Sequence, residues 1–522
     1  MSSNFDIQVK RQNHPFCKAM RILLGAVLFV ALGVGLCGCS SDENTDELTI
    51  AWTSNMGDYS LDPANNYMGW QGSYLGIYEQ LFRVDENFDI QPMLAESATQ
   101  VDDTTWEITI KEGITFQNGD VCDAAAVAAS LERAASENPR AKKALDAKQI
   151  TADGQMLTIV TNEPNMAYIS ELSEPVFSII DVDGSDDPSR PVGTGAYQIE
   201  EVDSSGNVVL RAYENYWQGS PSIKTVHAQY ITDDQSKVNA LQTGEIKGAM
   251  NIAADQLTSF EDDSQYTVNQ TNQGRAHMLY FNMNSGTMSD IRVREAVASC
   301  VDRASYVSSL YNGAAEVTQG VFPASSGYSE GISAPEFDTE HAKQLLAEAG
   351  YSDTDDDGYV DKDGEKLSLT FVTYEANAAL PKMCEVMSST LKEIGVDTSI
   401  EVAEKIGDRL NQDGWDIGTM AYNTLPTGDP YTYLSNVMYT DASSNYGNYS
   451  NEQVDALIDQ LKTTSDADVR TDIVKQIQEI ALGDCAYVYV VHALTSDVTA
   501  ANVSNLQMHG QYDWLNYEVT YQ

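Results

Sequence analysis

Basic residues are scarce in this sequence. Lysine and arginine number 30 against 78 aspartates and glutamates, so the 522-residue chain has a formal net charge of −48. Nucleic acid and anionic lipid surfaces repel a protein of this charge, and we therefore exclude nucleic acid as a partner. Cationic and zwitterionic partners stay open, although solubility alone also explains an acidic surface.

Two common catalytic patterns are also missing. The sequence contains no H-E-x-x-H zinc motif and no phosphate-binding P-loop. The histidines are scattered without paired spacing, and the seven cysteines form no C-x-x-C pair. These absences argue against an enzyme and against a resident metal or cofactor, while an extracellular hydrolase stays open as an alternative.

The apolar run at residues 22–36 is too short to span a membrane comfortably. It holds fifteen uncharged residues, whereas a transmembrane helix needs about 20. Arg21 precedes the run, as in the hydrophobic region of a secretory signal. The four residues Leu36-Cys37-Gly38-Cys39 that follow resemble the bacterial lipobox, in which the last cysteine receives the lipid.

This resemblance implies that residues 1–38 are a lipoprotein signal peptide and that residues 39–47 are a flexible tether. Cys39 is then the lipidated N-terminus, and the mature protein lies on the outer face of the cell membrane. Met20 is an alternative translation start. A metal clip formed by Cys37 and Cys39 is disfavoured because no histidine or further cysteine lies nearby in the sequence.

The other cysteines of the mature chain are Cys122, Cys300, Cys384 and Cys485. An extracytoplasmic compartment permits disulfides. Cys300 and Cys384, however, share helical spacing with apolar neighbours, which is typical of small core residues. We therefore predict free buried thiols.

Strand and helix patterns alternate from about residue 48 to the end, with no internal repeat, which predicts an α/β fold. Expected strands are residues 48–54, 105–111, 207–213, 225–231, 275–284, 367–374 and 486–492. Expected helices are residues 124–136, 236–246, 291–313, 341–351, 380–395, 454–463 and 472–483.

Several segments carry a family resemblance. The clearest is residues 106–134, with Trp106 on a strand, then Lys111, the turn Asn118-Gly119-Asp120 and a helix. Five more matches follow in order, at residues 190–199, 213–226, 281–303, 414–434 and 446–457. Together they resemble the peptide/nickel family (family 5) of extracellular solute-binding lipoproteins of bacterial ABC transporters, over about residues 48–510.

The resemblance implies a two-lobed periplasmic-binding-protein fold, type II-like, with an extra domain inserted in the first lobe. We expect lobe I at residues 48–284, including the inserted domain at about 84–188, and lobe II at residues 285–492. Residues 493–522 are expected to return to lobe I. Hinges are expected near residues 281–284 and 490–492.

The resemblance also implies a function. The protein would capture a peptide or related small solute in the cleft between the lobes and deliver it, as a monomer, to an ABC permease and ATPase. A nickel-chelate receptor of the same family and a peptide-sensing receptor without transport are the alternatives.

Six residues are candidates for contacting the solute. By resemblance, Asp429 lies where peptide-binding relatives receive a ligand ammonium, although an Asp-Pro helix cap is an equal alternative. Tyr431 stands where nickel-binding relatives can use a histidine, which weakens direct nickel ligation. Arg140 is a candidate anion grip, or else a surface charge. Aromatic walls of the cleft, or else core residues, are Trp70, Tyr422 and Trp415.

Residues 353–364 partly match a calcium-binding loop. Asp353, Asp355, Asp357 and Gly358 fit the pattern, but position 12, which needs a bidentate acid, is Gly364. Relatives commonly have an Asp/Gly-rich turn at this point, so we do not predict a metal site there.

Overall fold

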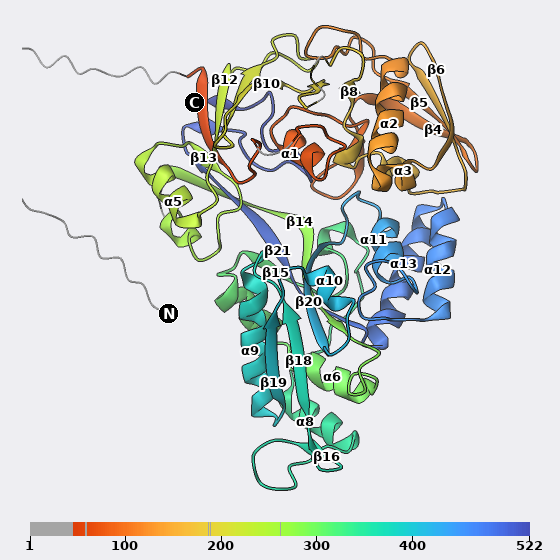
Figure 1. The fold of residues 1–522 in the computed structure, drawn as a ribbon, viewed down its shortest axis with the longest axis vertical. Helices are drawn as coiled ribbons and strands as arrows, with labels where there is room; N and C mark the ends of the chain where they lie inside the picture. The colour runs from red at the N-terminus through yellow and green to blue at the C-terminus, as the bar shows by residue number, and fades with distance from the viewer. Residues whose placement is uncertain (1–44, 58–59, 186, 188, 262) are drawn as a thin grey trace, which may run out of the picture. The chain divides into compact units, whose positions relative to one another are not determined.

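A central sheet of 11 strands organises the protein (Figure 1). The structure, a computed structural model, describes residues 45–522 apart from 58, 59, 186, 188 and 262, so the predicted signal peptide and Cys39 lie outside the described residues. Ten strands of the sheet follow the order β10-β11-β12-β1-β13-β21-β14-β20-β18-β19, and β15 pairs with β21. The sheet joins elements from the whole length of the chain.

The lobe I part of the sheet is built around β1 (Glu47–Trp52), which runs parallel to β12 (Thr225–Tyr230) and to β13 (Gly248–Ala249). Leu48 and Ile50 of β1 are fully buried. The antiparallel strands β10 (Tyr197–Val202) and β11 (Val208–Ala212) complete this side. Helices α1 (Met68–Tyr74) and α5 (Asp234–Thr243) also belong to this lobe.

The lobe II part contains β18 (Ser368–Thr373), β19 (Asp397–Val402) and β20 (Ile417–Asn423), with β15 (Ala315–Val317) at β21. Its helices are α6 (Ile291–Ser299), α7 (Arg303–Ser305), α8 (Thr339–Glu348), α9 (Ala379–Glu393), α10 (Ile406–Leu410), α11 (Pro430–Val437), α12 (Glu452–Thr463) and α13 (Ala467–Gly483). Separate apolar clusters form around β18 and α9 and around α11–α13.

Two long strands connect the two parts of the sheet. Strands β14 (Tyr266–Phe281) and β21 (Tyr487–Ala500) pair antiparallel along most of their length, with a register shift between Asn272 and Arg275. Residues 275–281 of β14 also pair with β20 of lobe II. The chain therefore passes between the lobes at about residues 272–275 and 493–494.

This pairing corrects one expected hinge. Residues 490–492 lie close to the passage, but residues 281–284 lie at the far end of β14. There the backbone N–H of Phe281 donates to Ala486 and that of Asn282 donates to Asp416, both within lobe II. Segments held in the lobe II sheet in this way do not act as the hinge.

A smaller domain is inserted into lobe I. Its four-stranded antiparallel sheet has the order β4-β5-β7-β6, built from β4 (Ala95–Asp102), β5 (Thr105–Ile110), β6 (Ala147–Asp153) and β7 (Met156–Thr161). Helices α2 (Ala124–Glu137), α3 (Pro139–Leu145) and α4 (Tyr168–Glu171) accompany it. An apolar cluster of its own runs from Leu81 to Ile179. The exact lobe and insert boundaries stay predictions.

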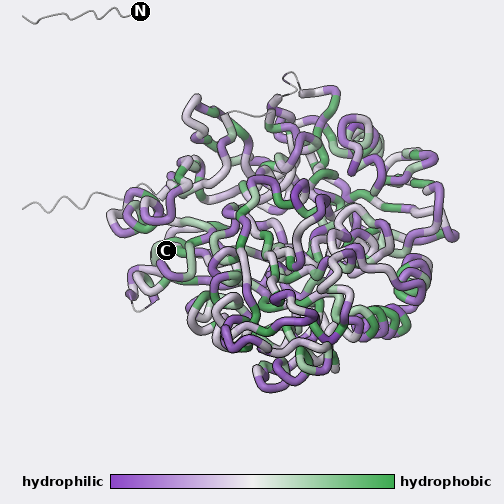
Figure 2. The backbone as a smooth tube through the Cα atoms, turned by 60° about the horizontal axis from the view of Figure 1, so that its bottom comes forward, coloured by the Kyte–Doolittle hydropathy of each residue, from purple (hydrophilic) through white to green (hydrophobic). Residues whose placement is uncertain are grey.

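Short strand pairs complete the fold: β2 (Phe82–Val84) with β3 (Ile90–Pro92), β8 (Ile180–Asp181) with β9 (Val192–Gly193), β16 (Asp361–Lys362) with β17 (Glu365–Lys366), and β22 (Val503–Ser504) with β23 (Thr520–Tyr521). Many of the outer loops consist largely of hydrophilic residues (Figure 2). No helix among the described residues has the length and hydrophobicity needed to cross a membrane.

The expected strands and helices are largely found, with one clear error. The helix expected at residues 291–313 stops at Ser299, and Asp302 begins a new turn by accepting a hydrogen bond from the N–H of Ser305. A π-helical turn at Tyr306–Leu310 follows. The predicted burial of four thiols is confirmed: Cys122, Cys300, Cys384 and Cys485 are buried and free.

Candidate functional site

Arg140 and Trp70, which lie far apart in the sequence, meet on lobe I. Arg140 belongs to the first turn of α3, a helix that begins where the side chain of Asn138 caps Arg140 and Ala141 and where Pro139 fixes the first position. Its guanidinium carbon lies 5.3 Å from the centre of the Trp70 ring on α1. The arrangement is a cation–π contact, and it brings two of the predicted site residues together.

Glu174 holds the guanidinium in place. Arg140 Nη2 donates to Glu174 Oε1 over 2.5 Å, and the side chain of Arg140 is 52% exposed while that of Glu174 is 5% exposed. Burial raises the pKa of Glu174, and the charge of Arg140 opposes that rise. Arg140 is therefore oriented by a buried acid and still presents part of its guanidinium to solvent, as an anion grip requires.

Aromatic rings extend this corner towards lobe II. The Trp70 ring makes edge contacts with Tyr67 and Tyr512, at centroid distances of 5.6 and 6.4 Å. The hydroxyl of Tyr512 donates to the carbonyl of Pro426 over 3.1 Å. Pro426 follows β20, so the corner formed by Trp70, Arg140, Glu174 and Tyr512 lies at the boundary between the lobes.

On lobe II, Asp429 is fully engaged by the protein. Its Oδ1 accepts the N–H of Tyr431 over 2.8 Å as the N-cap of α11, and its Oδ2 accepts Arg470 Nη2 over 2.5 Å. The side chains of Asp429 and Arg470 are 11% and 10% exposed. Of the two alternatives for Asp429, this geometry supports the helix cap, and it leaves no carboxylate oxygen unpaired to receive a ligand ammonium.

Tyr431 and Tyr422 are both half-buried. The Tyr422 hydroxyl donates to Ser444 Oγ over 3.0 Å, and its ring packs edge-on against Tyr433 at 5.4 Å. Burial raises the pKa of Tyr431, and the charge of Glu171 adds to the rise. Solute contact by either tyrosine stays a prediction.

Trp415 does not reach the boundary. It is 2% exposed within the apolar cluster of α11–α13, and its indole N–H donates to the carbonyl of Leu410 over 3.1 Å. The ring packs in the core and its one polar atom is satisfied, so the structure corrects the expectation that Trp415 walls the cleft.

The lobes touch at several points of this boundary. Lys462 Nζ pairs with Glu163 Oε2 over 2.7 Å, and the carbonyl of Lys462 accepts the N–H of Met166 over 2.8 Å. Gly428 has a φ of 75°, and a Cβ atom there would lie 2.5 Å from the carbonyl oxygen of Phe88. Only glycine allows this approach, and the contacts define a closed arrangement of the two lobes.

Sequence reasoning missed Glu171, Glu174, Tyr512 and Arg470. Glu171, at the end of α4, receives one hydrogen bond from Asn165 Nδ2 over 3.1 Å. Burial is the main cause that raises the pKa of Glu171 to about 8, and the charges of Glu174 and Asp429 add to the rise. No spacing in the sequence links these residues to Arg140 or Asp429, because the fold alone brings them together.

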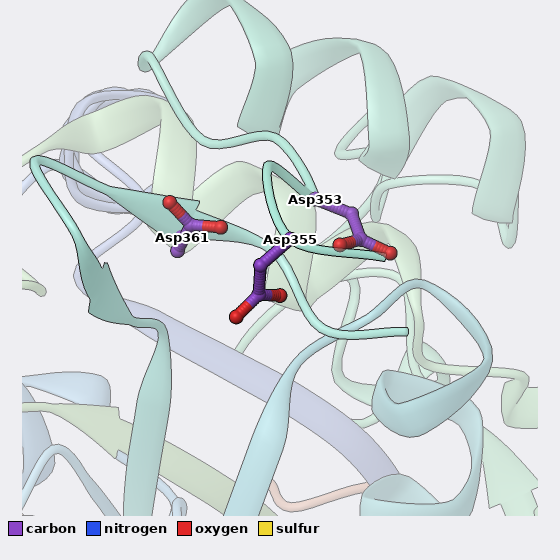
Figure 3. Close-up of side chains that lie close together, drawn as sticks. All are labelled: Asp353, Asp355 and Asp361. Carbon is purple, nitrogen blue, oxygen red and sulfur yellow. The ribbon is translucent and has the colours of Figure 1, made fainter. Parts of the chain in front are cut away.

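The acidic loop at residues 353–364 forms a cluster away from this corner. Figure 3 shows that the side chains of Asp353, Asp355 and Asp361 lie close together, and one ligand atom from each lies within 4.8 Å of the others. Asp361 also accepts hydrogen bonds from Thr354, and Asp357 pairs with Lys366 over 3.0 Å. Exposed acidic clusters of this kind need no ion, and calcium binding stays untested.

One G-x-S-x-G pattern is present, at residues 327–331. Its Ser329 is 7% exposed and donates to Gln478 Oε1 over 2.9 Å, while the Ser329 hydroxyl accepts the N–H of Phe322. The serine belongs to a loop after a 3-10 turn and not to a strand-to-helix elbow. Its hydroxyl links this loop to helix α13 by a hydrogen bond, which is a structural role.

Comparisons with known proteins agree with this architecture. The family model for bacterial extracellular solute-binding proteins, family 5 Middle, matches residues 89–445. The nickel-binding protein NikA of Staphylococcus aureus is 29% identical over 430 residues, covering 82% of this chain and 85% of the relative. The oligopeptide-binding protein AppA of Bacillus subtilis is 25% identical over 464 residues, covering 85% of each chain.

Solved structures extend the match. The crystal structure of a nickel ABC transporter protein from Bacillus halodurans is 31% identical with a TM-score of 0.78, covering 91% of this chain and 99% of that one. The S. aureus NikA structure in complex with Ni(L-His)2 has a TM-score of 0.76 at 27% identity, covering 91% of this chain and all of that one. The chain therefore belongs to family 5 of the bacterial extracellular solute-binding proteins, the proteins that capture solutes for ABC importers.

Proposed function

We propose that this protein captures a small solute with a carboxylate group, a peptide or a related compound, and hands it to its ABC permease without altering it. The observation that supports this proposal most directly is the Trp70–Arg140 corner at the lobe boundary. There the Arg140 guanidinium is oriented by Glu174, stacked on Trp70 and half exposed. Guanidinium groups bind carboxylates in a bidentate manner, and an aromatic face beside them supplies apolar contact.

A nickel chelate is the second candidate solute. The similarity to nickel-binding relatives of S. aureus and B. halodurans supports it. Trp70, Arg140, Tyr422 and Tyr431 include neither histidine nor cysteine, and imidazole and thiolate are the ligands that suit such metals. Nickel would therefore arrive inside a small chelator, with Arg140 holding a carboxylate of the chelator.

Mass spectrometry with parallel metal analysis of the gently purified protein separates these candidates. A released peptide without nickel supports the first candidate. Nickel in an amount equal to that of the protein, released together with an amino-acid chelator, supports the second. A released solute with no acidic group would contradict the proposed role of Arg140.

Replacing Arg140 tests the grip. Losing a charged hydrogen-bond donor costs about 1.5–3 kcal/mol, so Arg140→Gln should weaken binding of the released solute roughly 10- to 150-fold in calorimetric titration. Because Glu174 would be left buried without its partner, the double variant Arg140→Gln/Glu174→Gln should bind as weakly while regaining stability.

Arg211→Gln is the matched control. Arg211 has the same exposure, 52%, and pairs with Glu200 over the same 2.5 Å, but it lies on β11. The solute affinity of this variant should equal that of the wild type. Equal affinity in the Arg140 variant as well would show that the solute does not contact this guanidinium.

We further propose that the protein is anchored through lipid on Cys39 and acts as a monomer. The lipobox-like residues 36–39 support the anchor. A diacylglyceryl group carries two chains, which suffices for stable membrane attachment. Cys39→Ala should therefore release the protein into the medium or leave it unprocessed, as fractionation and intact mass would show. Normal processing with unchanged membrane retention would contradict the proposal.

A further inference from the structure

A cavity lies entirely within lobe I and the C-terminal segment. It has a volume of about 210 Å³ and is lined by residues from 73–93, 173, 195–196, 216–218 and 509–518. No residue from 285–492 lines it, so its shape does not require lobe II. Tyr512 lies between this cavity and the Trp70 corner, because it lines the former and contacts Trp70 with its ring.

Glu79 is the most buried acid of the cavity wall. It is 6% exposed, and its carboxylate accepts hydrogen bonds from the Tyr216 hydroxyl over 2.6 Å and from the Trp217 indole over 3.1 Å. Both donors are neutral. Lys111, the nearby cation, donates to the carbonyl of Met93 over 2.5 Å and lies 4.7 Å from the Trp217 ring centre. No hydrogen bond or ion pair to a cation is seen at Glu79 in the described part of the chain.

A second acid, Asp513, lines the same cavity. Asn516 Nδ2 donates to its Oδ1 over 3.1 Å, and Arg83 Nη1 forms an ion pair with its Oδ2 at 3.6 Å, a separation beyond hydrogen-bond length. The charge of Asp513 also disfavours ionisation of Glu79. Two carboxylates thus line one cavity and repel each other. Arg83 offsets the charge of Asp513 in part, and a cation between the two acids would relieve their repulsion further.

His509 adds an unsatisfied polar atom to this region. Its Nε2 is buried and has no hydrogen-bond partner among the described residues, and His509 is one of the residues that line the cavity. On its other side, Nδ1 lies 3.7 Å from Glu86 Oε1. A buried ring nitrogen without a partner costs free energy that a bound polar group would recover.

We propose that this cavity binds a small organic cation through an ammonium group placed between Glu79 and Asp513, independently of the solute held between the lobes. The volume is below the range typical of drug-sized ligands, which restricts the guest to a short amine. A metal ion is disfavoured, because among the described residues only Asp353, Asp355 and Asp361 bring three ligand atoms within 4.8 Å of one another.

Binding should strengthen with pH. Burial, together with the charge of Asp513, raises the pKa of Glu79 to about 7. The other ionisable groups that interact electrostatically with Glu79 are Tyr216, Lys111 and Cys122. Because an ammonium ion favours the ionised carboxylate, its affinity should rise between pH 6 and pH 8, the interval over which Glu79 loses its proton.

The test is an NMR titration of the full mature chain with n-butylammonium, using n-butanol as the neutral match of the same length. Butylammonium should bind and shift the indole N–H signal of Trp217, which donates to Glu79, and butanol should bind at least 10-fold more weakly. Glu79→Gln and Asp513→Asn should each weaken butylammonium about 10-fold or more. Solution scattering should show no change in radius of gyration on adding butylammonium.

Glu340→Gln is the control for non-specific attraction to the acidic surface. The Glu340 side chain is 81% exposed and, among the described residues, pairs only with Lys343 on α8, so butylammonium affinity should not change. Equal binding of butanol and butylammonium by the wild type would overturn the proposal, even if the cavity variants failed to fold. A loss of butylammonium affinity in the Glu340 variant equal to that in the Glu79 and Asp513 variants would also overturn it. Neither result would affect the Arg140 test of the solute site.

Discussion

Asp429 shows how one carboxylate can look like a ligand anchor in the sequence and act as a structural group in the fold. Its two oxygens cap α11 and pair with Arg470, which also donates to the carbonyls of Leu461 and Thr464. The side chain thereby joins the start of α11 to the loop between α12 and α13. This placement favours a role in stability over a role in solute capture.

Asp429→Asn tests this assignment. Asparagine caps helices nearly as well as aspartate, so the main loss is the charge facing buried Arg470. Removing one partner of a buried ion pair costs about 3–5 kcal/mol, and the two carbonyls that stay bound to Arg470 favour the lower end, about 3 kcal/mol. Chemical denaturation should show this loss, while the solute affinity should change less than threefold.

Asp466→Asn is the matched comparison. Asp466 caps α13 by accepting the N–H of Val469, is exposed and forms no ion pair in the described structure. Its substitution should change stability by less than about 0.5 kcal/mol. A solute affinity at least 10-fold lower in Asp429→Asn with unchanged stability would instead restore the ligand-anchor interpretation.

Single residues were predictable only where the sequence carries a local signal. Trp70 and Arg140 were singled out separately, and the fold brings them into contact, but nothing in the sequence points to Glu174 as the partner of Arg140. The sequence does not distinguish Trp415 from an aromatic residue of the cleft. Its burial depends on how α10, α11 and β20 pack, and residue type alone does not reveal this packing.

At the scale of elements, periodicity predicted most strands and helices, and it failed where local polar chemistry interrupted a continuous pattern. The apolar spacing of residues 291–313 continues through Asp302, whose side chain instead caps a separate turn. The length of β14 was also underestimated, because its first half, residues 266–272, alternates little and is paired only through β21. Long-range pairing, and not local propensity, makes that half a strand.

The contact of α12 with the inserted domain holds the lobes together. Lys462→Gln removes the ion pair with Glu163 and keeps the backbone bond to Met166, so it should favour the open arrangement and weaken solute binding modestly. Because Glu163 is 69% exposed, the effect of the pair should fade at high salt. Titrations of the solute at low and high ionic strength measure both effects.

Lys475→Gln is the control for this contact. Lys475 has the same side-chain exposure as Lys462, 27%, and faces Glu330 within lobe II at 3.8 Å. It should leave affinity and its salt dependence unchanged. A Lys462 variant that behaves identically to the Lys475 variant would mean that the Glu163–Lys462 pair does not favour the closed form.

At the scale of the whole molecule, the two crossing strands explain how the protein captures a solute. Strands β14 and β21 carry the sheet from one lobe to the other, and helices α1 and α3, which contain Trp70 and Arg140, lie on the part of lobe I near lobe II (Figure 1). Because each lobe has its own core, we expect rotation about the strands to open and close this boundary. The sequence predicted the two lobes through family resemblance, whereas the closed contacts at Lys462 and Gly428 required the structure.

Solution scattering of the mature protein, with and without the solute released from it, tests the central claim most directly. Closure of two rigid lobes around the solute should reduce the radius of gyration by about 1 Å, and Arg140→Gln should need a correspondingly higher solute concentration for the same change. A bound solute, verified by calorimetry, that leaves the radius of gyration of the wild type unchanged would contradict capture by lobe closure.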